Sequence, residues 1–266
     1  MNPFLLAKIA LLGLWLPGFA LAERLAPQAA RPTGSDGRRL TRNLGLWLAN
    51  TAMSPLLTVP ITAGAATLTL WQRPDWGPSW AMLALDLLLL DLWIYWWHRA
   101  NHEMQFLWRF HQVHHRDEFL DVTSGLRFHP GEVLASALVR GAFIIAMAMP
   151  LQSVLVYETI VLAAASFQHS NLKLPARFEG LLRLFIVTPS HHWVHHHAVR
   201  ADTDSNYGTL LTLWDRLFGS FSKTARTPEM SIGVEGARDK TLLGLALLPF
   251  QPQRMASRSV STQSSV

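Results

Sequence analysis

Histidine is the residue type whose number and spacing could do chemistry in this sequence. All twelve histidines lie between residues 98 and 197 of a chain of 266 residues. Most of them are spaced i, i+3 or i, i+4, which places side chains on one face of a helix. Three such sets occur: His98 and His102; His111, His114 and His115; His192, His195 and His196. Because neutral imidazole is a good ligand for iron, zinc and copper, this spacing predicts a metal site.

The size of the set indicates two metal ions rather than one. Eight imidazoles exceed what one tetrahedral or octahedral ion binds, and they suit two ions. The chain has no cysteine, so nitrogen and oxygen must supply the ligands. Soluble di-iron proteins rely on Glu-x-x-His pairs, and no such pair lies near these histidines. The sequence therefore predicts a histidine-rich dinuclear site of another type, with an adventitious metal-binding surface as the alternative.

The composition is that of a membrane protein. Half of the residues are hydrophobic and 15% are charged, against about 25% charged residues in an ordinary soluble domain. The formal net charge is +5. The basic residues are spread along the chain, so they indicate membrane topology rather than a nucleic-acid patch.

Three apolar runs have about the length of transmembrane helices, at residues 3–22, 44–70 and 80–97. The first run ends in a sequence that resembles a signal-peptide cleavage site, so a cleaved signal is the alternative. Cleavage would leave the arginine-rich loop at residues 23–43 outside, against the positive-inside rule, which favours a retained helix. In the second run a kink is expected at Pro60.

Two further apolar runs, residues 133–148 and 151–167, are separated by Met149 and Pro150. Each is short for a full span, which favours a helical hairpin in the membrane with Pro150 at or near its tip. Both ends of a hairpin lie on one side. By alternation from a cytoplasmic arginine-rich loop, three histidines then share the cytoplasmic face: His98, His129 and His169.

These features predict an all-α polytopic membrane protein. We expect about three transmembrane helices plus the hairpin, with a histidine-rich helical cap at the cytoplasmic face holding a dinuclear metal site. Its parts are the N-terminal helices with the arginine-rich loop (residues 1–78), a catalytic domain (79–223) and a C-terminal tail (224–266). A short amphipathic piece at residues 178–187 is expected at the membrane interface. The serine-rich last dozen residues are expected to be disordered.

The ordered motifs resemble the histidine boxes of the fatty acid hydroxylase/sterol desaturase superfamily of integral membrane oxygenases, and its bacterial members in particular. "HRANH" starts at His98, "HQVHH" at His111 and "HWVHH" at His192. "FLWRFHQVHH", "LRFHPGE", "FQHSN" and "NYGTLLTLWDRLFGSF" extend the resemblance over roughly residues 86–221. It implies a dinuclear iron centre and O2-dependent oxidation of a lipid C–H bond.

The resemblance also assigns ligands position by position. The implied metal ligands are His98, His102, His111, His114, His115, His169, His192, His195 and His196. Among them, His169 resembles an extra family ligand between the second and third boxes. His129 matches another recurrent family position, and His191 allows an alternative register of the third box. Both are further candidates, as ligands or as partners of ligands.

Nearby polar residues could orient imidazoles through their second ring nitrogen. Asp86 and Asp91 are the best candidates, since Asp91 lies seven residues, or two helical turns, before His98. A hydrogen bond between helices is the alternative for an acid inside a span. Asn206 and Asp215 are weaker candidates.

The sequence thus predicts a membrane-bound di-iron oxygenase that hydroxylates or desaturates a lipid. Two iron ions are the expected cofactor, and zinc could replace them on purification. The chain has no flavin or haem motif, so electrons are expected from a separate ferredoxin, cytochrome b5-like protein or reductase. The expected location is a bacterial inner membrane. The alternative is a membrane metal-binding or transport protein, but a transporter is expected to place ionisable residues near the midplane rather than at one face.

Overall fold

The computed structural model describes residues 10–34 and 36–252. Within these residues the chain is helical, with no strand longer than an isolated backbone pair. The elements in chain order are η1 (Leu11–Trp15), α2 (Leu16–Leu25), α3 (Asp36–Met53), α4 (Thr58–Thr67), α5 (Ser79–Glu103), α6 (Gln105–His115), η2 (Val122–Leu126), α7 (Pro130–Met147), α8 (Leu151–His169), α9 (Ala176–Leu182), α10 (Pro189–His195), α11 (Arg200–Thr203), α12 (Leu213–Leu217), α13 (Leu242–Leu247) and η3 (Leu248–Phe250).

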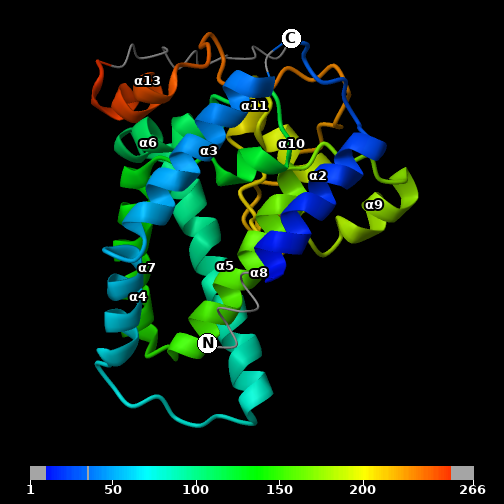
Figure 1. Cartoon of the computed structure of the whole chain (residues 1–266). Coiled ribbons are helices and arrows are strands. Elements are labelled where there is room, and N and C mark those ends of the chain that lie inside the picture. Colours follow the sequence, from blue (N-terminus) through cyan, green and yellow to red (C-terminus); the bar gives the residue numbers. More distant parts are fainter. Residues whose placement is uncertain (1–9, 35, 253–266) are drawn as a thin grey trace, which may run out of the picture.

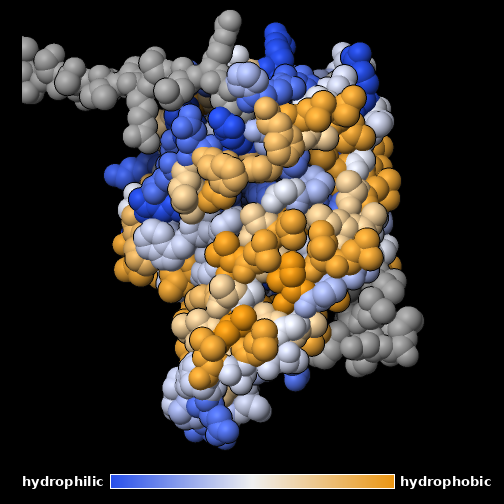
Figure 2. Space-filling view, turned by 90° about the vertical axis from the view of Figure 1, so that its left-hand side faces the viewer, coloured by the Kyte–Doolittle hydropathy of each residue, from blue (hydrophilic) through white to orange (hydrophobic). Residues whose placement is uncertain are grey.

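Long apolar helices form the body of the molecule. In the part of the chain that the structure describes, α5, α7 and α8 are long and apolar enough to cross a membrane. The pair α3 and α4, bent by 46°, could supply a fourth crossing. Figure 1 shows these helices extending away from a cap of short helices. Figure 2 shows a hydrophobic surface over the body, with hydrophilic residues gathered at the cap and at the opposite tip.

The second predicted span is broken before the position at which the sequence predicts a kink. α3 ends at Met53 and α4 begins at Thr58, with Pro55 in the turn between them. Pro55 has no N–H to donate, and it disfavours helical backbone in the residue before it. Pro60 lies in the first turn of α4, where proline is tolerated because those N–H groups have no partner inside the helix. The prediction of a kink at Pro60 is therefore wrong.

The expected arginine-rich loop at residues 23–43 is helical at both ends. Helix α2 ends at Leu25 and helix α3 begins at Asp36, so residues 36–43 belong to α3. Arg39 is only 4% exposed, and its Nε donates to Asp117 Oδ1 at 2.7 Å while its Nη1 donates to Asp121 Oδ2 at 2.9 Å. This contact between Arg39 and two carboxylates holds the first turn of α3 in place. Such a contact cannot be read from the sequence, which is why the loop prediction is wrong there.

The predicted turn between the two apolar runs is confirmed, with α7 before it and α8 after it. Each helix is long enough to cross a membrane, so the expectation that both runs are short for a span is wrong. α7 packs mainly on α4, and α8 packs on α5. Ala148 ends α7 in the left-handed conformation (φ 48°), and Pro150 precedes α8 as its N-cap residue. The third predicted span is also confirmed, and it continues as α5 to Glu103. His98 and His102 therefore lie on the same rigid helix as the apolar run before them.

Both ends of the chain extend beyond the described residues. Of the first expected helix (residues 3–22), residues 3–9 lie outside them, as does the serine-rich segment expected to be disordered. The described part of the first run packs on α8, where Trp15 Nε1 donates to Ala163 O at 3.1 Å. Within residues 224–252, Leu245 and Leu248 pack against α3 and α6.

Candidate metal centre

Four helices bring nine histidines to one place under the cap. They come from α5 (His98, His102), α6 (His111, His114, His115), α8 (His169) and α10 with the residue after it (His192, His195, His196). Met104 between α5 and α6 is extended (φ −93°, ψ 114°), so the chain turns and α6 packs beside the end of α5. α8 contributes its last residue.

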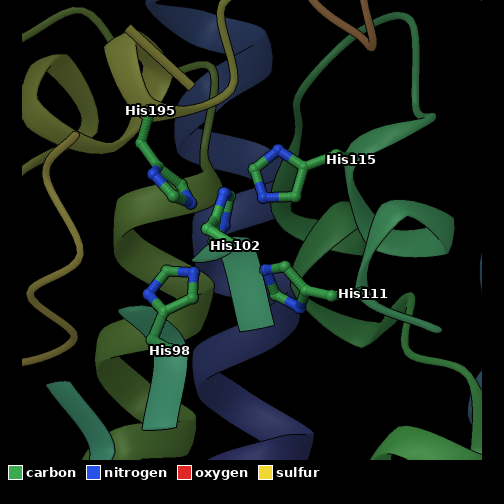
Figure 3. Close-up of side chains that lie close together, drawn as sticks. All are labelled: His98, His102, His111, His115 and His195. Atoms are coloured by element: carbon green, nitrogen blue, oxygen red, sulfur yellow. The ribbon is translucent and has the colours of Figure 1, made fainter. Parts of the chain in front are cut away.

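These histidines form two groups of buried imidazoles, in each of which one ring nitrogen per residue lies within 4.8 Å of all the others. The five-histidine group consists of His98, His102, His111, His115 and His195. The four-histidine group consists of His114, His169, His192 and His196. Figure 3 shows the five-histidine group, whose rings converge from α5, α6 and α10. The structure thus brings together all nine histidines that the sequence singles out as ligands.

Five of the nine rings are held through Nδ1, on the side away from the other imidazoles. In four histidines this atom lies at hydrogen-bond distance from a backbone carbonyl oxygen: His98 from Tyr207 (2.8 Å), His195 from Ser205 (2.7 Å), His114 from Arg127 (3.1 Å) and His169 from Ala165 (2.7 Å). In His111 it lies 2.7 Å from Glu132 Oε1. Carbonyl and carboxylate oxygens only accept hydrogen bonds, so Nδ1 carries the proton in these rings and the Nε2 lone pair stays free.

The four-histidine group brings two such lone pairs face to face. His114 Nε2 lies 3.1 Å from His169 Nε2, although both rings use Nδ1–H for a carbonyl oxygen. Burial and the neighbouring histidines lower the pKa of His114 well below its usual value, so its ring is neutral near pH 7. Two facing lone pairs repel at this distance unless a cation lies between them. This group therefore fits a metal ion.

The five-histidine group fits a metal ion for a different reason. Among the described residues, no hydrogen-bond partner exists for the buried Nε2 atoms of His102, His111, His115 and His195. Each buried polar atom without a partner costs about 1–3 kcal/mol. Burial and the other histidines lower the pKa of His115 and of His195, which keeps their lone pairs available near neutral pH. Four such atoms in one small space indicate a shared cation.

The sequence suggests that Asp91 orients an imidazole, but in the structure its carboxylate binds other partners. Its carboxylate accepts hydrogen bonds from Trp214 Nε1 (2.8 Å) and Tyr157 OH (2.9 Å). Seven residues of helix correspond to about 10 Å along the axis, which is beyond the reach of an aspartate side chain from His98. Asp91 therefore makes hydrogen bonds between helices, which is the alternative that the sequence left open.

Asp86 lies deeper in the body and also holds helices together. It forms an ion pair with Arg73, and it accepts a hydrogen bond from Ser153 Oγ at 2.6 Å. Asp86 thus links the segment between α4 and α5, which contains Arg73, to α5 and to the start of α8. The structure does not bring Asp86 to the histidines.

Asp215 and Asn206 do support a histidine, but one outside the two groups. His191 Nε2 lies 2.9 Å from Asp215 Oδ2, and Asn206 Nδ2 donates to His191 O at 3.0 Å. His192, the next residue, belongs to the four-histidine group. The structure therefore follows the register of the third box that starts at His192.

His129 also lies outside both groups. Its Nδ1 accepts a hydrogen bond from Gly131 N (2.9 Å), which caps the start of α7, and its Nε2 donates to Ala246 O (3.0 Å). Sequence reasoning missed Glu132, the buried acid that holds His111. The motif "RFHPGE" contained a signal for Glu132. This residue lies in the first turn of a helix that starts at Pro130, and the N-terminus of a helix favours an acidic side chain there.

Comparisons with known proteins agree with this site. Residues 83–220 match the model of the fatty acid hydroxylase family. Alkylglycerol monooxygenase of Danio rerio is 33% identical over 147 residues, which make up 55% of this chain and 32% of that protein. Ornithine lipid hydroxylase of Rhizobium tropici is 31% identical over 177 residues, or 66% of this chain and 53% of that protein. Lathosterol oxidase of Mus musculus is 31% identical over 154 residues, or 55% and 48%.

The chain spans about a third to about half of the length of these relatives. No solved structure matches it. The family match covers just over half of the chain and contains all nine histidines of the two groups. The chain belongs to the fatty acid hydroxylase family.

Proposed function

We propose that the protein is a membrane-bound di-iron oxygenase that hydroxylates or desaturates a C–H bond of a lipid, using O2 and externally supplied electrons. The observation that carries the proposal is the pair of buried imidazole groups at the end of the apolar helices. Relatives named monooxygenase, hydroxylase and oxidase support an oxidoreductase that acts on lipids. Residues 79–223 would form the catalytic domain.

Two iron ions are the proposed cofactor, one in each group, with all nine histidines as their ligands. Bound there, they would supply the redox chemistry with O2. Zinc also binds imidazole and could replace iron on purification. The chain itself orients the ligands: Glu132 and the carbonyls fix which ring nitrogen faces the ion, and the tight packing of the cap keeps bulk water away.

The depth of the two groups supports an amphiphilic substrate that is oxidised close to its headgroup. His169 is the last residue of α8, and His98 stands near the end of α5, so both groups lie at one end of the candidate spans. In a bilayer with a hydrocarbon core of about 30 Å, the ends of the acyl chains lie roughly 15 Å deeper than that level. The carbons nearest the headgroup lie at the level of the two histidine groups.

The arginine-rich segment supports a cytoplasmic position for the metal centre. Arg39 contacts Asp117 and Asp121 in the cap, so residues 23–43 lie at the same end as the histidines. By the positive-inside rule this end faces the cytoplasm. We therefore propose a bacterial inner membrane as the location. A ferredoxin, cytochrome b5-like protein or reductase would deliver electrons from the cytoplasmic side.

Lipid analysis of a bacterial host tests this function. The host expresses the wild type, His114→Ala or His197→Ala, together with a ferredoxin and its reductase. His197 is the matched control, because it lies outside both groups with Nδ1 2.8 Å from Asp202 Oδ2. We expect a lipid that gains one oxygen or loses two hydrogens with the wild type and with His197→Ala, and none with His114→Ala.

Two results would contradict the proposal. One is no oxidised lipid from the wild type although its metal sites are filled. The other is equal product from His114→Ala. Metal uptake into vesicles without any oxidised lipid would favour the transport alternative.

A further inference from the structure

An apolar ledge projects from the side of the cap. It is formed by α9 with the turn after it and by α12. Six of its large apolar side chains are 48–65% exposed: Phe178, Leu181, Leu184, Phe185, Leu213 and Leu217. None of them belongs to a candidate span. So much exposed apolar surface outside the spans needs an explanation.

The orientation of α9 is the reverse of that in a water-exposed helix. Such a helix turns its apolar stripe toward the core and its charges toward solvent. In α9, Phe178 and Leu181 share one face, three residues apart, and are 52% and 60% exposed. Glu179 is instead 9% exposed, and its Oε1 accepts a hydrogen bond from Ser190 N at 2.8 Å. The outer face of α9 therefore suits an apolar environment.

The two parts of the ledge form one surface. Thr212 N, just before α12, donates to Phe185 O at 3.1 Å, and Arg216 Nη2 donates to Arg183 O at 2.8 Å. The guanidinium groups of Arg183 and Arg216 also lie 4.6 Å and 4.8 Å from the ring centre of Phe221. These contacts fix α12 to the turn after α9, so a partner would meet both at once.

Charge on the ledge has one sign. In residues 173–187 and 211–218, the exposed charged residues are Lys173, Arg177 and Arg216. The two acids there, Glu179 and Asp215, are buried. Exposed apolar side chains mixed with basic ones are typical of segments that lie in the headgroup region of an anionic bilayer.

The ledge also lies next to the exposed apolar side of α2, a helix that contacts the candidate span α8. Leu21 and Leu25 on α2 are 60% and 76% exposed beside α8. Lys173 N, three residues before α9, donates to Ala26 O at 2.8 Å, which ties the segment leading into the ledge to the end of α2. Figure 1 shows α9 at the edge of the molecule near that end of α2.

We propose that this ledge lies in the headgroup region of an anionic membrane leaflet. Its apolar side chains insert among the upper acyl chains, and Arg177 and Arg216 contact lipid phosphates. The contact fixes the height of the cap above the bilayer. The proposal is independent of the metal chemistry, since it rests only on exposure and charge.

Site-specific quenching tests the proposal without an activity assay. The chain has no cysteine, so Leu181→Cys and Leu217→Cys can each carry a single fluorophore. Leu138→Cys, 55% exposed on the candidate span α7, is the control within the bilayer. Glu235→Cys, in an exposed turn of the cap, is the control in water. All four are placed in nanodiscs of phosphatidylcholine and phosphatidylglycerol.

We expect a lipid nitroxide placed just below the headgroup to quench Leu181→Cys and Leu217→Cys, and aqueous iodide to quench only Glu235→Cys. Iodide quenching at the ledge equal to that of Glu235→Cys would overturn the proposal. Protection from iodide without quenching by the nitroxide would also overturn it, because a protein partner or a second copy would then cover the ledge.

Two arginine substitutions test the preference for anionic lipid. An arginine near an anionic surface favours contact by about fivefold. In Leu181→Cys, nitroxide quenching is therefore expected to be stronger in nanodiscs with phosphatidylglycerol than in phosphatidylcholine alone. Adding Arg177→Gln and Arg216→Gln is expected to abolish this difference, whereas Arg38→Gln and Arg238→Gln, at exposed cap positions outside the ledge, preserve it. A difference that survives the ledge substitutions would refute the role of the two arginines.

Discussion

The two histidine groups share α6 and α10, and each has two rings held by backbone carbonyls, but they differ in their other supports. In the five-histidine group a buried carboxylate, Glu132, lies 2.7 Å from His111, and four of the inward Nε2 atoms have no hydrogen-bond partner among the described residues. In the four-histidine group the inward Nε2 atoms touch one another at 2.9–3.1 Å. Behind two of its rings stand the backbone carbonyls of Arg127 and Ala165.

The four-histidine group also has a support that the family match does not include. Glu23 Oε2 accepts hydrogen bonds from Asn171 N (3.0 Å), two residues after His169, and from Val122 N (3.1 Å). Arg39 binds Asp117, two residues after the end of α6. Arg31 lies between Glu23 and Asp121, 2.6 Å from Glu23 Oε1 and 3.0 Å from Asp121 Oδ2. We call Glu23, Arg31 and Arg39, with Asp117 and Asp121, the N-terminal brace. Glu132 thus supports one ring of the five-histidine group directly, whereas the N-terminal brace supports the segments that follow His115 and His169.

The largest effect is expected from breaking the brace. Arg39→Ala leaves Asp117 and Asp121 buried without their main cation, which typically costs about 3–5 kcal/mol. Urea unfolding in mild detergent measures this loss. The neighbouring Arg38→Ala is the matched control, because Arg38 is exposed and should change stability by less than about 0.5 kcal/mol. Equal stability of the two variants would show that the brace contributes nothing.

Glu132→Gln tests the support of the five-histidine group. The amide keeps the size of the side chain but removes the negative charge behind His111. Loss of such a partner usually weakens metal affinity by about 10–100-fold. We expect competition with a chelator to strip one of two metal ions more readily and to leave the second unchanged. Glu118→Gln, an exposed acid just after α6, is the control. Equal weakening of both ions would contradict separate roles for the two groups.

The brace also predicts an acid-dependent loss of stability. Burial alone would raise the pKa of Asp121, but the charge and hydrogen bonds of Arg39 outweigh it and lower that pKa to about 2. A pKa below the unfolded value of about 4 contributes roughly 2 kcal/mol, which is present above pH 4 and lost as the pH falls toward 2. The stability difference between wild type and Asp121→Asn should therefore shrink over that range. A constant difference would contradict the ion pair.

The smallest effect is expected at His129, which lies near the groups but in neither. His129→Ala removes the cap of α7, at a cost of about 1 kcal/mol. Metal content should stay at the wild-type value, and His129→Asn should restore most of the stability because asparagine also caps helices. Loss of a metal ion in His129→Ala would mean that the groups are larger than the structure indicates.

The sequence predicted the metal-facing side of the site well because that side depends on local spacing. Imidazoles three or four residues apart share a helix face whatever surrounds the helix, and this brought His111, His114 and His115 to one side. The turn between α7 and α8 followed from Pro150 and from the apolar runs on both sides of it, although each run proved long enough to cross a membrane. These features need no knowledge of distant contacts.

The partners behind the rings could not be predicted in the same way. Asp91 has the correct helical phase relative to His98 but binds Trp214, 123 residues away in sequence. Glu132 reaches His111 from another helix. Pairings of this kind depend on how helices pack, and spacing within one helix does not report them. The brace likewise joins segments that lie far apart in the sequence. From the sequence alone, their charges indicated only membrane topology.

Metal analysis of the protein purified in mild detergent, loaded with iron and freed of loosely bound metal, tests whether the two groups hold a dinuclear centre. Two buried imidazole groups predict about two metal ions per chain in the wild type and in His197→Ala. His195→Ala, in the five-histidine group, and His192→Ala, in the four-histidine group, should each hold fewer. One ion or none in the folded wild type, or two ions retained in both His195→Ala and His192→Ala, would contradict a dinuclear centre at this site.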